Sequence, residues 1–191
     1  AQDSRTIASF NITKYLQAGV NKLAVQVFRW SDGSYLEDQD FWRLSGIYRN
    51  VYLASKPKVH LEDFFTTTTF DKEYRDANLD IKLSLNNKSS KSFKKGNIAV
   101  ELFDTSGKLV KLDGEILKKI SLIKEGQSFE LNLSFFIDNP LQWSDETPNL
   151  YTLLIKLLNE KNQIIDQVSS KVGFRQVEVR GREIFVNNQP L

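Results

Sequence analysis

The sequence predicts an all-β chain, in which an immunoglobulin-like β-sandwich follows the last strands of another β-domain. Most segments alternate apolar and polar residues with a period of two, which is typical of half-buried antiparallel strands. Six or seven such runs, separated by turn residues, succeed one another between about residues 58 and 176, as in a sandwich. A short helix is an alternative only in "EILKKISLIK" (115–124), where a strand–loop–strand reading fits the surroundings better.

Two strands are expected before Pro57. "NKLAVQVFRW" (21–30) places Leu23, Val25 and Val27 on one face, and "GIYRNVYLA" (46–54) reads as the next strand. Proline has no backbone N–H to donate to a β-ladder. We therefore expect a domain boundary near Pro57.

The elements expected beyond this boundary follow in order. "ANLDIKLSLNN" (77–87) and "QSFELNLSFFI" (127–137) alternate cleanly as single strands. Three hairpins are predicted from their turn residues, and they cover 97–112 with a turn at 105–107, 150–174 with a turn at 160–162, and 177–191 around Gly181.

Composition excludes several classes of function. The 26 basic and 24 acidic residues nearly balance, which gives no reason to expect a nucleic acid or an anionic membrane as partner. The lysine-rich run 88–96 reads as a solvated loop. The chain has no cysteine, so disulfides and thiolate chemistry are excluded. It shows no signal pattern and no apolar run near the roughly 18 residues of a membrane span, and these features fit either cytoplasm or periplasm. Both ends indicate a piece of a longer chain.

The stretch "RWSDGSYLEDQDFWRLSGIYRNVYL" (29–53) crowds four acids among six aromatic residues. Glu37 and Asp40 could form the carboxylate pair of a glycosidase, but two acids on one loop would be poorly fixed. A calcium loop of the EF-hand type fails because Trp42 and Arg43 occupy the fifth and sixth positions, where the motif needs a ligand and a glycine.

Two other interpretations of this stretch remain open at this point. In the first, aromatic faces stack on a sugar ring while carboxylates accept hydrogen bonds from its hydroxyl groups. In the second, Trp30 and Trp42 fill the core, Asp32-Gly33 makes a turn, and Glu37 and Asp38 face water.

The same stretch resembles the signature run of the β-galactosidases of glycoside hydrolase family 2. The resemblance extends upstream through "SRTIASFNITKYLQAGVNKLAVQV", and it returns in "NPLQWSDETPNLYTLLI" and "VGFRQVEVRGREIFVNNQPL". Between about 60 and 135 the chain resembles the family in strand pattern more than in identity.

The resemblance implies three parts. Residues 1–57 would be the C-terminal part of a galactose-binding-like, sugar-binding jelly-roll domain. Residues 58–176 would be an immunoglobulin-like β-sandwich domain, and residues 177–191 a hairpin leading into a TIM-barrel catalytic domain absent from this chain. The family's catalytic glutamates lie on that barrel, so we expect no catalytic residue in this chain and no activity from it alone.

The whole enzyme implied is a retaining β-galactosidase that hydrolyses terminal β-D-galactosides. By the same resemblance it would use Mg²⁺ and Na⁺, pack this chain against its own barrel and form a homo-oligomer. The alternative is a carbohydrate-binding or cell-surface β-sandwich without enzymatic activity, which would account for the strands but not for the run around Asp40.

One functional residue carries over from the family. Asp40 in "LEDQDFW" matches the aspartate that reaches the active site from the first domain, where it contacts the galactose 6-hydroxyl and a monovalent cation. By this resemblance Asp40 is the substrate-binding residue and a metal ligand in the full-length enzyme. Glu37 and Asp38 would position its loop, and Trp30, Trp42 and Tyr48 would pack beneath it.

The sandwich itself shows no site in the sequence. His60 is the only histidine, and we interpret it as structural, without a spaced acid or a second ligand. Arg175 is expected to form a salt bridge at the barrel junction. Trp143 and Pro148 predict a rigid corner that leads into a strand.

Overall fold

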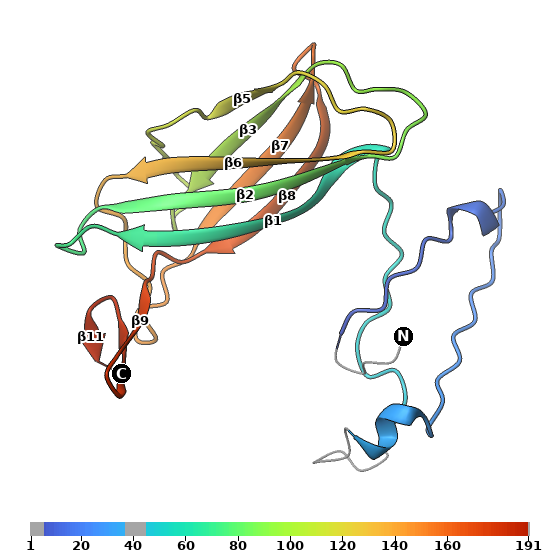
Figure 1. Cartoon of the computed structure of the whole chain (residues 1–191), viewed down its shortest axis with the longest axis horizontal. Coiled ribbons are helices and arrows are strands. Elements are labelled where there is room, and N and C mark those ends of the chain that lie inside the picture. Colours follow the sequence, from blue (N-terminus) through green and yellow to red (C-terminus); the bar gives the residue numbers. More distant parts are fainter. Residues whose placement is uncertain (1–5, 37–44, 191) are drawn as a thin grey trace. The chain divides into compact units, whose positions relative to one another are not determined.

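The alternating runs after Pro57 form strands in the computed structural model, which describes residues 6–36 and 45–190. The chain divides into two units, Ala1–Ala54 and Ser55–Leu191, and each is described here by itself. The second unit contains all the strands of the described part of the chain (Figure 1).

The strands of the second unit are named in chain order. They are β1 (Val59–Phe70), β2 (Ala77–Asn87), β3 (Gly96–Phe103), β4 (Leu109–Val110), β5 (Leu117–Ile120), β6 (Ser128–Ile137), β7 (Tyr151–Asn159), β8 (Ile164–Val172), β9 (Val177–Arg180), β10 (Glu183–Val186) and β11 (Gln189–Pro190).

Two antiparallel sheets face each other in this unit. One has the order β1-β2-β6, and the other has the order β4-β3-β7-β8, with β5 also paired to β3. This division of strands between two layers is that of an immunoglobulin-like sandwich, so the predicted all-β fold class is confirmed. Strands β9, β10 and β11 form a small separate sheet.

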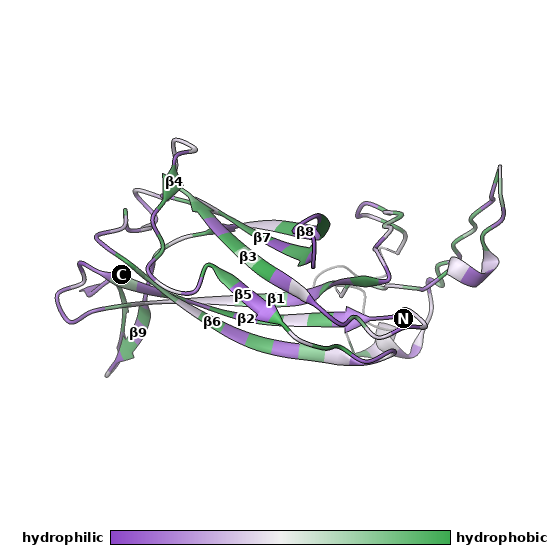
Figure 2. Cartoon of the chain, turned by 90° about the horizontal axis from the view of Figure 1, so that it is seen from above, coloured by the Kyte–Doolittle hydropathy of each residue, from purple (hydrophilic) through white to green (hydrophobic). Residues whose placement is uncertain are grey.

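Alternation along the strands explains why the two sheets pack together. In β2 every second residue is buried from Ala77 to Asn87, and β3 shows the same pattern. Figure 2 shows the matching change of hydropathy along β6 and β2. Because side chains on a strand point to opposite faces in turn, each sheet has one apolar face.

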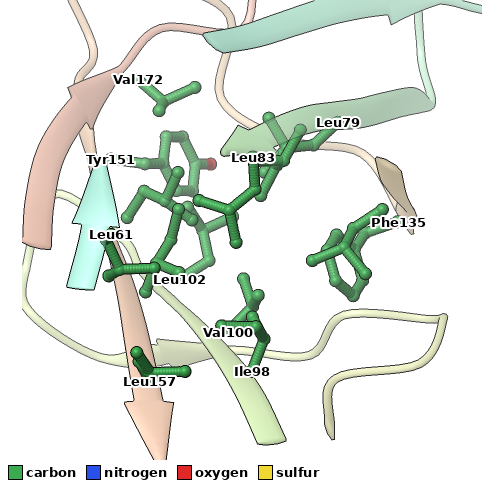
Figure 3. Close-up of a cluster of buried hydrophobic side chains, with 14 of the residues drawn as sticks. Leu61, Leu79, Leu83, Ile98, Val100, Leu102, Phe135, Tyr151, Leu157 and Val172 are labelled. Atoms are coloured by element: carbon green, nitrogen blue, oxygen red, sulfur yellow. The ribbon is translucent and has the colours of Figure 1, made fainter. Parts of the chain in front are cut away.

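The core lies between these apolar faces. Leu79 and Leu83 from β2, Phe135 from β6 and Leu102 from β3 are almost completely buried, and Figure 3 shows their side chains directed towards one another with those of the facing strands. At roughly 25 cal/mol per Å² of apolar surface, burial of this set is the main stabilising contribution to the unit.

The predicted hairpins are present. β3 and β4 are joined by a turn in which Asp104 accepts hydrogen bonds from the backbone N–H groups of Ser106 and Lys108. Asn162 adopts a positive φ of 58° between β7 and β8, a conformation that asparagine tolerates in turns. The run 115–124 contains strand β5 and no helix, which confirms the strand interpretation.

The sandwich has two distinct ends. Val59, where the linker joins β1, pairs with Asn87, whereas Phe70 at the other end of β1 pairs with Ala77. The backbone N–H of Phe70 also donates to the side chain of Gln176, just after β8. The linker and the β9–β11 hairpin therefore attach at opposite ends of a strand of 12 residues, which spans roughly 35 Å.

The first unit differs from the sequence prediction. In its described residues, 6–36 and 45–54, only two 3₁₀-helices form, Thr13–Tyr15 and Asp32–Tyr35. The strands predicted over 21–30 and 46–54 are wrong, and Leu23, Val25 and Val27 are 65%, 57% and 47% exposed. A strand must pair its N–H and C=O groups with a neighbour, and these segments have no paired strand among the described residues.

No helix in the described part of the chain is both long enough and apolar enough to cross a membrane.

Candidate functional site

The predicted sugar-contact stretch is described only in part. Its helical turn Asp32–Tyr35 is closed by a capping box, in which Ser31 and Ser34 exchange hydrogen bonds between side chain and backbone, and this confirms the turn expected at Asp32-Gly33. Asp40, the predicted substrate and cation contact, lies outside the described residues, together with Glu37, Asp38 and Trp42.

Two aromatic residues of this stretch are exposed. Trp30 is 55% exposed and Tyr48 is 64% exposed, so Trp30 does not fill a core among the described residues, whereas the expected packing of both rings beneath the loop of Asp40 concerns residues outside them. Each ring instead has a neighbouring arginine over it, at 5.9 Å for Arg29 and 5.6 Å for Arg49. Burial would need a sheet face to pack against, and the described residues of the first unit form no sheet.

Glu178 on β9 is the centre of a group of polar contacts in the second unit. Its carboxylate accepts hydrogen bonds from the hydroxyl of Tyr74, the amide of Gln176 and the Nε of Arg180, at 2.5, 2.5 and 2.8 Å. The Tyr74 hydrogen bond, followed by those of Arg180 and Gln176, lowers the pKa of Glu178 from 4.5 to about 2. Glu178 is therefore ionised at neutral pH and shared among three donors.

Tyr74 reaches this carboxylate from the turn that joins β1 and β2. The turn is closed by the backbone of Asp71 and Asp76, and Tyr74 adopts a positive φ of 54° within it. Its ring stacks on Phe70 with 5.8 Å between centroids. The hydrogen bond to Glu178 is the main reason that the pKa of Tyr74 is raised, so the phenol stays neutral and acts as a donor.

A second set of contacts joins the hairpin to the Trp143 corner. The buried side chain of Asn187 accepts from the backbone N–H of Gln176 and donates to the carbonyl of Trp143. The backbone of Trp143 pairs with Pro148 and donates to the carbonyl of Phe174, which confirms the predicted rigid corner.

Arg175 does not form the predicted salt bridge among the described residues. Its guanidinium lies over the ring of Trp143, 4.6 Å from the centroid. Gly173 makes this approach of the chain possible, because a Cβ at that position would stand 3.0 Å from Trp143. The arginine therefore contributes a cation–π contact to the same corner.

These contacts border a shallow hollow of about 440 Å³ at the hairpin end of the sandwich. It is lined by the β1–β2 turn, the Trp143 corner and the β10–β11 turn, with Lys72, Tyr74, Gln142, Asp145, Asn187 and Gln189 among its residues. Among the residues that the structure describes, no group of three or more His, Cys, Asp or Glu side chains could hold a metal ion. The arrangement binds one segment of the chain to another.

His60 lies at the opposite, linker end and is 2% exposed. Its Nε2 is 2.5 Å from a carboxylate oxygen of Glu62, and its Nδ1 is 2.8 Å from the carbonyl oxygen of Pro57. The structural role expected for His60 fits these contacts, but the expected lack of a nearby acid is wrong. Their separation of only two residues was the available signal, although the register shift between Leu61 and Asp63 breaks the regular alternation of faces at this point.

The network around Glu178 was also missed in the sequence. Glu178 and Arg180 alternate on β9 and could have been paired by that spacing. Tyr74 could not, because it is 104 residues away from Glu178 in the chain.

Comparison with known families adds an independent result. Residues 59–175 match the family description "Glycosyl hydrolases family 2", and residues 1–57 match "Glycosyl hydrolases family 2, sugar binding domain".

The curated relatives include proteins named beta-galactosidase from Priestia megaterium, 40% identical over 99% of this chain, and from Vibrio cholerae, 42% identical over 100% of it. The chain spans only 18% of the length of each.

Solved structures show the same fold. A calcium-binding mutant of Bacteroides uniformis beta-glucuronidase 2 has a TM-score of 0.69 and 25% identity, covering 80% of this chain and 19% of that one. A putative beta-galactosidase from Bacteroides fragilis has a TM-score of 0.58 and 18% identity, covering 70% and 20% of the two chains. Because a family description matches most of the length, including the whole sandwich, the chain belongs to glycoside hydrolase family 2.

Proposed function

We propose that this chain is a non-catalytic part of a retaining β-galactosidase that hydrolyses terminal β-D-galactosides in carbohydrate metabolism. The observation that carries the proposal is the identity of about 40% to proteins named beta-galactosidase along essentially the whole chain. This identity includes the stretch 29–53, which resembles the signature of the galactosidases rather than that of the glucuronidases.

The chemistry of such an enzyme belongs to residues outside this chain. Retaining glycosidases use two carboxyl groups about 5 to 5.5 Å apart, one as nucleophile and one as acid and base. Glu178, on the hairpin that follows the sandwich, is ionised and occupied by Tyr74, Gln176 and Arg180. It is therefore unsuited to donate a proton to a leaving group.

We assign to the sandwich the role of a spacer. Polar contacts hold the linker at one end, and the Glu178 and Asn187 contacts hold the β9–β11 hairpin at the other. A well-packed core between the ends resists deformation. Such a spacer would fix the distance between a sugar-binding domain and a barrel, and an error of about 1 Å at a catalytic site can cost about a hundredfold in rate.

Asp40 is proposed as the residue that the first domain contributes to the substrate. A single carboxylate can accept a hydrogen bond from a sugar hydroxyl and supply one oxygen ligand to a monovalent cation. The remaining ligands of that cation, and any Mg²⁺ site, would come from the barrel, because hard cations in proteins need several oxygen ligands and one carboxylate supplies too few. The substrate, the barrel and further copies of the enzyme are the partners that this proposal implies.

The first test uses the 191-residue chain alone. We expect no hydrolysis of a nitrophenyl β-galactoside at any enzyme concentration that remains soluble. Turnover above the uncatalysed rate would contradict the proposal that the reactive carboxylates lie elsewhere.

The second test replaces Asp40 with Asn in the full-length enzyme. Loss of a hydrogen bond to a charged group should raise KM for a galactoside about tenfold or more, and it should weaken the response to Na⁺. Asp32→Asn is the matched control, because Asp32 belongs to the same acidic stretch but sits in the 3₁₀-turn. An unchanged KM and an unchanged Na⁺ response in Asp40→Asn would remove Asp40 from the site.

A further inference from the structure

The linker that joins the two units is fixed to the sandwich by an unusual side chain. His60 follows Pro57 by three residues and is buried. The next residue, Leu61, is also buried and belongs to the hydrophobic core. Side chains of adjacent strand residues point to opposite faces. His60 is therefore buried on the side away from the core, where its recorded polar contacts are with Pro57 and Glu62.

Both ring nitrogens of His60 face acceptors. The carbonyl oxygen of Pro57 can only accept, so Nδ1 carries a hydrogen, and the carboxylate of Glu62 accepts from Nε2. The ring is therefore held from both sides, by the carbonyl of Pro57 at Nδ1 and by the carboxylate of Glu62, 2.5 Å from Nε2.

Glu62 is well placed to hold the ring of His60. Its pKa is lowered, first by the hydrogen bond from His60 and also by the charges of Lys88 and Lys56. The ladder between β1 and β2 shifts register between Leu61 and Asp63, so Glu62 is the extra residue of a β-bulge. Bulges commonly redirect a side chain out of the regular alternation.

Further contacts hold the same short linker. The backbone N–H of Lys88 donates to the carbonyl of Lys58 at 2.7 Å. The ammonium group of Lys56 lies 3.5 and 3.4 Å from the carbonyls of Leu61 and Glu62. Lys56 and Pro57 are thus in contact with residues of β1, and Lys58 is bonded to Lys88, the residue after β2. Among the side chains that make these contacts, that of His60 is the buried one.

We propose that His60 is a positioning residue, which clamps the carbonyl of Pro57 and so fixes the direction in which the linker leaves the sandwich. The inference rests on the proposed function, in which this linker carries the domain that presents Asp40 to the substrate. Loss of the clamp would let the linker pivot, and the contact made by Asp40 would weaken without any change in the reacting groups.

The clamp can be measured apart from activity. The amide of Lys88 reports on the linker, because its hydrogen bond ends on Lys58. The amide of Leu61, which donates to Asp166 on β8 at 2.9 Å, reports on the same strand through a hydrogen bond whose acceptor lies outside the linker. In the 191-residue chain, we expect His60→Leu to speed hydrogen exchange at Lys88 about tenfold or more and to leave Leu61 unchanged.

A second variant guards against misfolding of a buried substitution. Glu62 is 41% exposed, so Glu62→Gln should fold normally while it removes the charge that pairs with the ring. We expect the same exchange effect at Lys88, smaller than in His60→Leu. The control is Glu130→Gln, which removes an exposed ion pair of 3.3 Å with Lys82 and should change neither amide.

Activity is then measured in the full-length enzyme. We expect His60→Leu and Glu62→Gln to raise KM for a galactoside by about three- to tenfold, with a smaller change in kcat, because only the placement of a binding group is disturbed. The Glu130→Gln enzyme should match the wild type in both constants.

The outcomes separate the two proposals. If exchange at Lys88 is unchanged in both linker variants, the clamp is overturned whatever the activity. If exchange is faster and Asp40→Asn raises KM but the linker variants do not, positioning is overturned while the proposed role of Asp40 stands. If Asp40→Asn also has no effect on KM, the proposed role of Asp40 fails and the positioning inference fails with it.

Discussion

Replacement of Phe174 should test how much core packing stabilises the hairpin end of the sandwich. Its side chain is completely buried, and its ring meets Tyr151 edge to face, with centroids 4.9 Å apart and planes at 87°. Its carbonyl accepts the backbone N–H of Trp143. The residue therefore links β7, the Trp143 corner and the start of the hairpin.

Replacing Phe174 with Ala should lower the free energy of unfolding by about 3–5 kcal/mol, because buried phenylalanine truncations lose transfer energy and leave a cavity. Edge-to-face contact with Tyr151 accounts for about 0.5–1.5 kcal/mol of that loss. Domains are stable by only about 5–15 kcal/mol. The midpoint of thermal unfolding should therefore fall by roughly 10–20 °C.

The assay is denaturant and thermal unfolding followed by circular dichroism of the β-sheet. Phe174→Leu keeps most of the apolar volume and should cost about 1–2 kcal/mol. Phe136→Ala is the matched control, since this phenylalanine is 42% exposed on β6, and its truncation should cost less than about 1 kcal/mol. A loss below about 1 kcal/mol in Phe174→Ala would refute the packing argument for this end of the core.

Three further predictions concern the hairpin end and the sandwich edge. The pKa of Glu178 is lowered from 4.5 to about 2, so between these values the folded hairpin binds fewer protons than the unfolded chain. The stabilising contribution of Glu178 is therefore complete above pH 4.5 and is lost as the pH falls towards 2. Amide exchange in the hairpin should detect this pH dependence, and Glu178→Gln should abolish it. Gly96→Ala should destabilise the sandwich by about 1–3 kcal/mol or more in denaturant unfolding, because the new Cβ would stand 2.4 Å from the backbone oxygen of Leu158, and an unaffected midpoint would contradict this close approach. Arg175→Leu should shift the fluorescence of Trp143 by removing the guanidinium 4.6 Å from its ring, whereas a spectrum identical to the wild type would show that the two side chains do not meet in solution.

The strands of the sandwich could be predicted because their signal is local. The alternation from Leu79 to Leu85 requires one apolar face, and a strand of period two is the structure that provides it. The hairpin turns were equally readable, since Ser106, Gly107 and Asn162 are residue types that favour turn conformations. Each of these predictions depends on neighbours within about ten residues of the chain.

The same reasoning failed for 21–30 because alternation is necessary for a strand but is not sufficient. Leu23, Val25 and Val27 alternate as well as any run in β2, yet they are exposed. The difference is pairing: β2 lies between β1 and β6, whereas the described residues around 21–30 have no sheet neighbour. Alternation in the sequence indicates which face of a strand could be buried. Whether that face is buried depends on a partner strand.

The polar contacts that define both ends of the sandwich lay beyond the reach of pattern reasoning. Tyr74 meets Glu178 only because the β1–β2 turn and β9 come to the same end of the fold, and a pair so distant in sequence has no periodic signal. His60 and Glu62 are close in sequence, but the burial of the histidine depends on the linker turning back towards β1. Residues that fix a fold's ends therefore have to be found from the structure.

The positions of these contacts also explain why the sandwich can act at a distance without a site of its own. A packed core has few alternative arrangements, so displacement at one end is passed on chiefly as rigid-body motion of the whole unit. With β1 spanning roughly 35 Å, a tilt of only a few degrees at the hairpin end would move the linker end by more than an ångström. The Glu178 and Asn187 contacts limit that tilt at one end, and the His60 contact limits the pivot of the linker at the other. Stiffness in the middle is useful only because both ends are held, which makes the end contacts, rather than the core, the sensitive positions for function.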